Sequence, residues 1–248
     1  NNAQINEKEP FKGLFTQGMV CHETYKDNNN KWCNPNEIEK INEKVFVKAT
    51  DKTKIIVGPS ESMSKSKKNV IDPESMIKLF GADAVRWFIL SDSPPERDVQ
   101  WSNQGVNAAY KFLQKIYNLN YIIIHRPENK SLQDKKFEIT FNNYILKITN
   151  LINNFHLNVV VANIYSIHSF FMENIKNEIS NKCLKKNFIN LMKTLIPFIP
   201  HLAHECLEQQ GETEIHTWPE INDKLPLNEM IKIAVQINGK TRDIIEVK

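Results

Sequence analysis

Cysteine and glycine are scarce in this chain, since its 248 residues include four cysteines and seven glycines. The cysteines show no Cys-x-x-Cys spacing, which argues against a disulfide framework and against a closed zinc site; they are Cys21, Cys33, Cys183 and Cys206. We therefore predict free thiols, no zinc held by this segment and a reducing compartment, the cytoplasm.

Long apolar runs and a strong excess of one charge are also missing. No run is long enough to span a bilayer and the chain does not open on a signal peptide, so we expect no membrane partner. A net charge of +3 makes no electrostatic case for nucleic acid by itself. Hydrophobic residues make up 41% of the 248 residues, which suffices to form the cores of one large or two small domains.

The most distinctive stretch is residues 60–69, which alternate hydroxyl and ammonium side chains around Met63. Lysine offers a point charge to phosphate oxygens and serine a neutral hydrogen bond, so the composition suits a polyphosphate. We expect Met63 to hold this loop down as an apolar anchor. The alternative is a solvated turn or linker, which is the usual role of such a run.

The flanks of this stretch favour the phosphate interpretation. Residues 54–59 have the pattern of a short buried strand that ends in a turn. Downstream, Asp72 and Pro73 predict the start of a helix, with Asp72 as N-cap and Pro73 in the first turn. A strand, a charged loop and a helix in this order are common at phosphate sites.

Residues 63–66, Met-Ser-Lys-Ser, resemble the signature loop of class I aminoacyl-tRNA synthetases, whose usual form is Lys-Met-Ser-Lys-Ser. Ser62 stands where the family has its first lysine, whereas Lys65 matches the second. The resemblance implies that ATP is bound by Met63, Ser64, Lys65 and Ser66. It also implies that Lys65 is catalytic and that Mg²⁺ accompanies the ATP.

Other segments resemble leucyl-tRNA synthetases in particular, and they follow in that family's order. Residues 9–20 contain Thr-Gln-Gly-Met-Val, similar to the segment ahead of the signature loop, although a plain core strand is the alternative. Two predicted hairpins follow and resemble the family's small β insertion; they pair 22–25 with 31–35 and 45–47 with 55–57. Residues 81–102 are similar to the link between catalytic and helical domains.

From Ser102 onward, repeated amphipathic faces with short connections predict an antiparallel helical bundle. The expected apolar positions are Val106, Ala109, Leu113, Ile116 and Tyr117; Tyr144, Ile145, Ile148, Leu151, Ile152 and Phe155; Ile164, Ile167, His168, Phe171 and Ile175; Leu184, Phe188, Leu191, Met192 and Leu195. In the family that the chain resembles, this bundle binds the anticodon, and residues 197–201 are similar to its Pro-Phe-x-Pro-His element.

Several basic residues keep two interpretations. Arg86 either faces phosphate or caps a surface. Contact with an RNA backbone or plain solvation are both open for Lys111, Lys115, Lys182, Lys185, Lys186 and Lys193.

His201 and His204 imitate the other class I signature, His-x-Gly-His, but the glycine is missing and the order along the chain is wrong. We expect both on a helix, without a catalytic or metal role. Near the end, alternating residues on both sides of Asn238 and Gly239 predict a hairpin. It resembles the start of the small C-terminal domain of bacterial-type leucyl-tRNA synthetases. Because the chain begins with Asn1, not methionine, we expect a piece of a longer polypeptide.

The sequence therefore predicts a mainly α fold with small β parts. By resemblance, it comprises the end of a Rossmann-type class I catalytic domain with a β insertion (1–71), a helical linker (72–102), an anticodon-binding bundle (103–222) and the first hairpin of a C-terminal α/β domain (223–248). The resemblance implies a monomeric, cytoplasmic leucine–tRNA ligase that uses leucine, ATP and tRNA(Leu), the fragment being inactive alone. The alternatives are an isoleucyl- or valyl-type enzyme, or a non-catalytic tRNA-binding protein derived from a synthetase tail.

Overall fold

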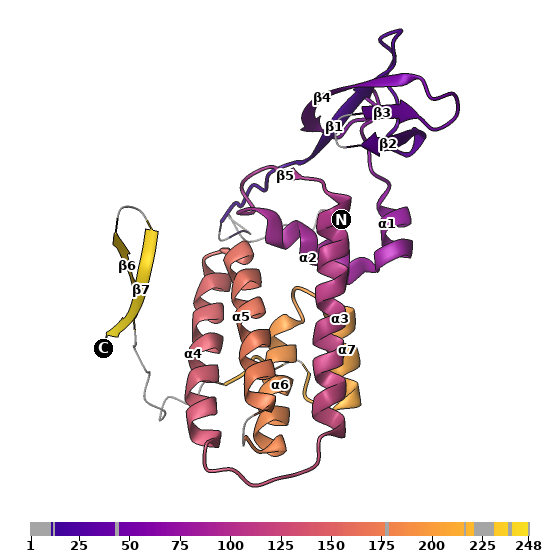
Figure 1. The fold of residues 1–248 in the computed structure, drawn as a ribbon. Coiled ribbons are helices and arrows are strands. Elements are labelled where there is room, and N and C mark those ends of the chain that lie inside the picture. Colours follow the sequence, from indigo (N-terminus) through magenta and orange to yellow (C-terminus); the bar gives the residue numbers. More distant parts are fainter. Residues whose placement is uncertain are drawn as a thin grey trace, which may run out of the picture. The chain divides into compact units, whose positions relative to one another are not determined.

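The computed structural model describes residues 11, 13–42, 45–176, 179–215, 217–220, 231–237 and 240–247 (Figure 1). The chain divides into two compact units. The first contains Asn1–Pro73 and Asp92–Ser102, and the second contains Glu74–Ser91 and Asn103–Lys248. Among the described residues, none of the helices combines the length and the apolar character needed to cross a membrane.

The first unit is built on a five-stranded mixed sheet with the order β2-β3-β4-β1-β5. Its strands are β1 (Val20–Lys26), β2 (Ile38–Asn42), β3 (Val45–Lys48), β4 (Lys54–Ser62) and β5 (Val99–Gln100). Neighbours are antiparallel except for β1 and β5, which run parallel. A short 3-10 turn, η1 (Pro35–Glu37), precedes β2.

The predicted pairing of 45–47 with 55–57 is present, whereas the predicted hairpin of 22–25 with 31–35 is limited to a turn and an isolated bridge without a second strand. After β1 the chain turns through Asp27, whose Oδ1 accepts hydrogen bonds from the backbone N–H groups of Asn29 at 2.9 Å and Lys31 at 3.0 Å. Trp32 then returns to form a bridge with Lys26. The second pairing sets β3 against β4, with Phe46 opposite Ile55. The sequence did not indicate β2 or the long pairing of β1 with β4, because both depend on distant partners.

The expectation that the strand from Lys54 ends in a turn at Pro59 is wrong, since β4 continues to Ser62. Proline is tolerated there because the ladder is irregular, with Glu23 opposite Ser60 but Tyr25 opposite Val57. At this bulge Thr24 Oγ1 donates a hydrogen bond to the Pro59 carbonyl at 3.0 Å. Residues 60–62 therefore belong to the sheet and not to a mobile loop.

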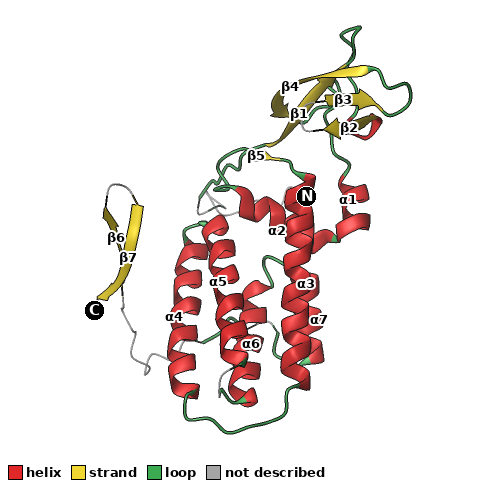
Figure 2. Cartoon of the chain, in the orientation of Figure 1, coloured by secondary structure: helices red, strands yellow, loops and turns green. Residues whose placement is uncertain are grey.

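The described helices are drawn in red in Figure 2. They are α1 (Pro73–Phe80), α2 (Ala82–Asp92), α3 (Asn103–His125), α4 (Asp134–Asn153), α5 (Leu157–Ile175), α6 (Asn181–Leu195) and α7 (Pro200–Gln209). Gly81 and Gly211 follow the ends of α1 and α7 with φ of 82° and 75°, a left-handed conformation that glycine adopts without steric cost. The fold is thus mostly helical with a small mixed sheet.

In the second unit, α3 to α7 stand side by side as a bundle (Figure 1). Its core contains Ile116, Ile148, Ile164, Phe188 and Leu195, each at most 1% exposed. Two predicted core positions are wrong: Tyr117 is 43% exposed and Phe155 is 50% exposed. Phe155 lies beyond the end of α4 with φ of 56°, so the helical period no longer applies to it.

The predicted hairpin near the end of the chain is present as β6 (Ile231–Ile237) and β7 (Lys240–Val247), which pair in antiparallel register. The Asn238 and Gly239 turn lies outside the described residues. Residues 1–10 also lie outside the described residues.

Candidate functional site

The loop between β4 and α1 is held in a compact turn by hydrogen bonds among its own residues. Ser64 Oγ lies 3.2 Å from Ser66 Oγ and accepts a hydrogen bond from the Lys67 backbone N–H at 3.3 Å. The Lys68 N–H donates to the Lys65 carbonyl at 3.3 Å. The predicted ATP-binding residues Met63, Ser64, Lys65 and Ser66 thus lie together in one turn that follows a strand.

The lysines of this loop differ in their surroundings. Lys65 is exposed and forms no ion pair with any residue in the described part of the chain. Lys67 instead pairs with Glu61 of β4, and Lys68 is exposed with φ of 55°. Lys65 and Lys68 therefore keep exposed side chains without an ion pair among the described residues, whereas Lys67 is held by Glu61.

The prediction that Met63 is the buried anchor of the loop is wrong, because its side chain is only half-buried. The buried side chain is that of Asn69, whose exposed fraction is 0%. Its amide bonds to the backbone of the loop and of both neighbouring strands. Sequence reasoning missed this residue; the only signal was an amide side chain directly after a run of lysines.

Two segments that stand far apart in the sequence meet beside this loop. The Gly18 N–H donates to the Pro95 carbonyl at 2.8 Å, and the Met19 N–H donates to Asp98 Oδ1 at 2.8 Å. A Cβ on Gly18 would lie 2.0 Å from the carbonyl oxygen of Arg97. The Thr-Gln-Gly-Met-Val segment therefore needs glycine because another backbone passes directly against it.

Arg86 takes the structural role of the two considered. Its Nε donates to the Phe198 carbonyl at 3.1 Å and its guanidinium also donates to the Pro197 carbonyl at 2.6 Å. The Asp83 carboxylate accepts hydrogen bonds at the start of α7. Both residues of α2 thus hold the turn between α6 and α7.

Both histidines lie on α7, as expected. His201 Nδ1 lies 2.9 Å from Asp83 Oδ1, and His204 Nδ1 lies 2.7 Å from the Pro200 carbonyl. In the described residues, no three His, Cys, Asp or Glu side chains gather as a metal site. His22 beside Cys21 lies on β1, where burial lowers the pKa of His22 and the Glu23 backbone opposes that shift.

The six lysines left open between RNA contact and solvation differ in exposure. The Lys193 side chain is only 10% exposed, with Glu212 at 3.6 Å. Lys186 is exposed and pairs with Glu138 at 2.9 Å. Lys111, Lys115, Lys182 and Lys185 are exposed as well.

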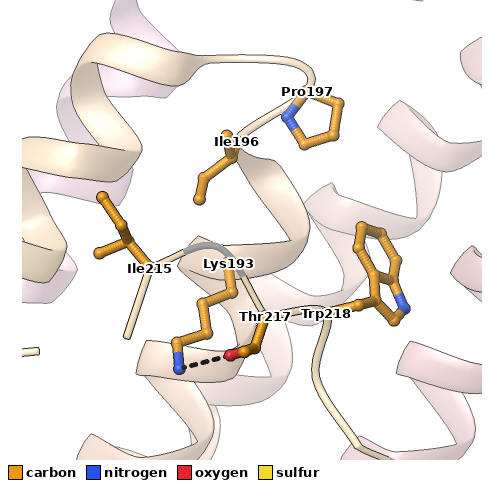
Figure 3. Close-up of a pocket in the computed structure, with 6 residues that line it drawn as sticks. All are labelled: Lys193, Ile196, Pro197, Ile215, Thr217 and Trp218. Atoms are coloured by element: carbon orange, nitrogen blue, oxygen red, sulfur yellow. Dashed lines mark hydrogen bonds between the residues drawn. The ribbon is translucent and has the colours of Figure 1, made fainter. Parts of the chain in front are cut away.

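Lys193 also lines a cavity of about 180 Å³ in the bundle unit (Figure 3). Its other lining residues are Ile196, Pro197, Ile215, Thr217 and Trp218. Lys193 Nζ lies 3.5 Å from Thr217 Oγ1, and the Trp218 indole N–H donates to Thr149 Oγ1 at 3.1 Å. The polar groups of Lys193, Thr217 and Trp218 thus already have partners within the chain.

Comparison with protein families matches two parts of the chain. Residues 134–248 match the anticodon-binding domain of tRNA ligase. Residues 55–102, which include β4, the loop, α1, α2 and β5, match tRNA synthetases class I (I, L, M and V).

Individual relatives match nearly the whole chain. The leucine–tRNA ligase of Zymomonas mobilis is 37% identical over 248 residues, covering 99% of this chain and 28% of the relative. That of Orientia tsutsugamushi is 39% identical over 247 residues, covering 97% of this chain and 29% of the relative.

A solved structure is similar as well. The agnB2 leucyl-tRNA synthetase of Agrobacterium radiobacter K84, crystallised in a ternary complex with tRNA and LeuAMS, matches with a TM-score of 0.62 and 28% identity. The match covers 75% of this chain and 25% of that one. The chain thus spans less than a third of the length of these relatives.

Proposed function

Since the chain belongs to the class I leucyl-tRNA synthetases and corresponds to the C-terminal portion of such an enzyme, we propose that it serves ATP-dependent activation of leucine and transfer to tRNA(Leu). The observation that carries this proposal is the Met63 to Ser66 turn after β4, with Lys65 exposed within it, inside the segment that matches the class I family. Leucine, ATP and tRNA(Leu) are the proposed partners.

In the first step, the leucine carboxylate attacks the α-phosphorus of ATP, and pyrophosphate leaves with growing negative charge. An ammonium group aimed at the β- and γ-phosphates stabilises that charge more in the transition state than in the ground state. We assign this role to Lys65, with Ser64 and Ser66 as hydrogen-bond partners of the phosphates and Met63 beside them. Mg²⁺ enters with ATP and neutralises part of the phosphate charge.

The remaining parts are assigned by the same proposal. Residues 1–71 form the end of the Rossmann-type catalytic domain with its β insertion, and 72–102 form the linker. Residues 103–222 form the bundle that meets tRNA, and 223–248 begin a C-terminal α/β domain. Four buried free thiols fit the reducing cytoplasm, where the enzyme is proposed to act as a monomer.

The test uses the full-length enzyme that carries this chain and measures ATP–pyrophosphate exchange. Lys65→Ala is expected to slow leucine-dependent exchange by about a hundredfold or more, with little change in the KM for leucine. Lys54→Ala removes an equally exposed lysine at the other end of β4 and is expected to keep the wild-type rate. An unchanged rate in Lys65→Ala contradicts the proposal.

The amino-acid dependence of the exchange decides between the proposed substrate and its relatives. Exchange is expected with leucine and not with isoleucine or valine. Absence of exchange with all three amino acids in the full-length protein supports a non-catalytic tRNA-binding role instead.

A further inference from the structure

The side chain of Asn69 is completely buried, and both of its polar atoms are paired. Its exposed fraction is 0%. Oδ1 accepts a hydrogen bond from the Ser64 backbone N–H at 2.8 Å. Nδ2 donates to the carbonyls of Glu61 at 3.1 Å and His22 at 3.2 Å. Only this orientation of the amide places a donor opposite each acceptor, because an amide oxygen cannot donate to a carbonyl.

These contacts join three parts of the chain at the base of the loop. His22 and Glu61 stand opposite one another in the ladder of β1 and β4. Ser64 lies just beyond the end of β4, while Asn69 lies where the loop leaves the sheet toward α1. The chain entering the loop is also tied to β1, because the Met63 N–H donates to the Val20 carbonyl at 3.2 Å.

Other contacts of the loop are weaker candidates for holding it to the sheet. The ion pair of Lys67 and Glu61 is about 40% and 35% exposed, and exposed pairs contribute little because water and salt screen them. The Ser64 and Ser66 hydroxyls bond only within the loop. A buried amide that loses its partners, in contrast, leaves several backbone groups without hydrogen bonds in a dry site.

We propose that Asn69 is a positioning residue that fixes both ends of the Met63 to Lys68 turn to β1 and β4, and thereby sets where Lys65 meets ATP. This proposal rests on the role of Lys65 proposed above. Asn69 itself touches no substrate: its effect reaches the phosphates only through the loop backbone. Catalysis by a placed charge is sensitive to such support, because a displacement of about 1 Å costs on the order of a hundredfold in rate.

The experiment compares Asn69→Ala, Lys65→Ala and the double variant in the full-length enzyme. The measured quantity is the single-turnover rate of leucyl-adenylate formation, normalised to folded enzyme. Asn34→Ala is the matched control, because it removes a side-chain amide of the same unit whose hydrogen bond goes to Glu37 at 2.6 Å, within its own turn.

Asn69→Ala is expected to lower the adenylate rate by about ten- to a hundredfold, with the KM for leucine within about twofold of wild type. In the Lys65→Ala background the same change is expected to cost less than about threefold, because its effect acts through Lys65. If the rate losses of the two single variants multiply in the double variant, the positioning role of Asn69 is overturned and the role of Lys65 is not. No effect of Lys65→Ala overturns the proposed function, and the positioning of Lys65 with it.

Hydrogen exchange of the Ser64 amide provides the readout that does not depend on activity. Asn69→Ala is expected to speed exchange at Ser64 by about tenfold or more, since that amide loses its acceptor, while Asn34→Ala leaves it unchanged. Unchanged protection of Ser64 in Asn69→Ala overturns the proposal. If the alanine variant does not fold, Asn69→Asp takes its place, because aspartate keeps the acceptor for the Ser64 N–H and loses both N–H donors of the amide. In this variant the Ser64 amide is expected to stay protected. The adenylate rate is expected to fall when Lys65 is present and to change little in the Lys65→Ala background.

Discussion

Asp83 of α2 accepts a hydrogen bond from the Leu202 backbone N–H at 2.7 Å, across 119 residues of sequence. Its other carboxylate oxygen lies 2.9 Å from His201 Nδ1 and 3.4 Å from the His201 backbone N. The first N–H groups of a helix have no acceptor within it, and the positive end of the helix dipole favours a carboxylate there. Asp83 therefore gives α7 the cap that its own Ile199 does not supply.

Removal of this cap is expected to destabilise the bundle. Asp83 is 8% exposed, so Asp83→Ala leaves the partly buried N–H groups of His201 and Leu202 without this acceptor and is expected to lower the free energy of unfolding by about 1–3 kcal/mol. Asp83→Asn keeps an acceptor and is expected to cost less. Urea unfolding followed by circular dichroism measures both. Asp92→Asn, at the exposed end of α2, is the control, and an equal loss there contradicts the prediction.

Gly18 is expected to tolerate no side chain. An added Cβ would meet the Arg97 carbonyl carbon and oxygen at about 2 Å, so Gly18→Ala forces two backbones apart and breaks the Gly18 bond to Pro95. We expect a loss of about 1–3 kcal/mol and faster amide exchange in β1 and β5.

Gly13→Ala is the matched control for this change, because nothing lies within 4 Å of a Cβ at Gly13. It is expected to leave exchange in both strands unchanged. Equal protection of β1 and β5 in the two alanine variants would show that the close approach at Gly18 is not required.

His168 is expected to make the bundle sensitive to acid. The ring centroids of His168 and Phe112 lie 5.6 Å apart in an edge-on arrangement. Burial lowers the pKa of His168 below 6.5, and a hydrogen bond with the Lys115 backbone opposes that shift. The unfolded chain therefore binds the proton first as the pH falls. The stabilising effect is complete above about pH 6.5 and is lost as the pH falls from there through the folded-state pKa.

Urea unfolding between pH 8 and pH 5 measures this effect. His168→Gln is expected to flatten the pH dependence of the unfolding free energy in that window. Ser169→Ala changes an exposed, uncharged neighbour on α5 and is expected to keep it. A slope that persists in His168→Gln assigns the acid sensitivity to another group.

The features that the sequence predicted are those set by neighbouring residues. The apolar period of α6 and Pro73 at the start of α1 each act within a few positions. The features that it missed join residues far apart: Asn69 to His22 across 47 residues, Met19 to Asp98 across 79, and Asp83 to Leu202 across 119. Local periodicity carries no information on such pairs, because they depend on which strands and helices become neighbours.

Lys68 is expected to prefer glycine, because its φ of 55° lies in the left-handed region. A side chain there costs about 1–2 kcal/mol, whereas the extra freedom of glycine in the unfolded chain costs about 0.5–1 kcal/mol. Lys68→Gly is therefore expected to be more stable than Lys68→Ala. The comparison of glycine with alanine removes the lysine side chain from both variants and isolates the backbone effect.

The same two substitutions at Lys67, to glycine and to alanine, are expected to give the opposite order of stability. Among the described residues, positive φ at non-glycine positions occurs at Asn30, Lys52, Lys68 and Phe155, so Lys67 lies outside the left-handed region. At Lys67, glycine therefore adds unfolded-state entropy without relieving strain, and alanine is expected to be the more stable variant. Urea unfolding of the four variants measures the two differences. If both differences have the same sign, the turn does not hold Lys68 in the conformation that joins Lys65 to Asn69.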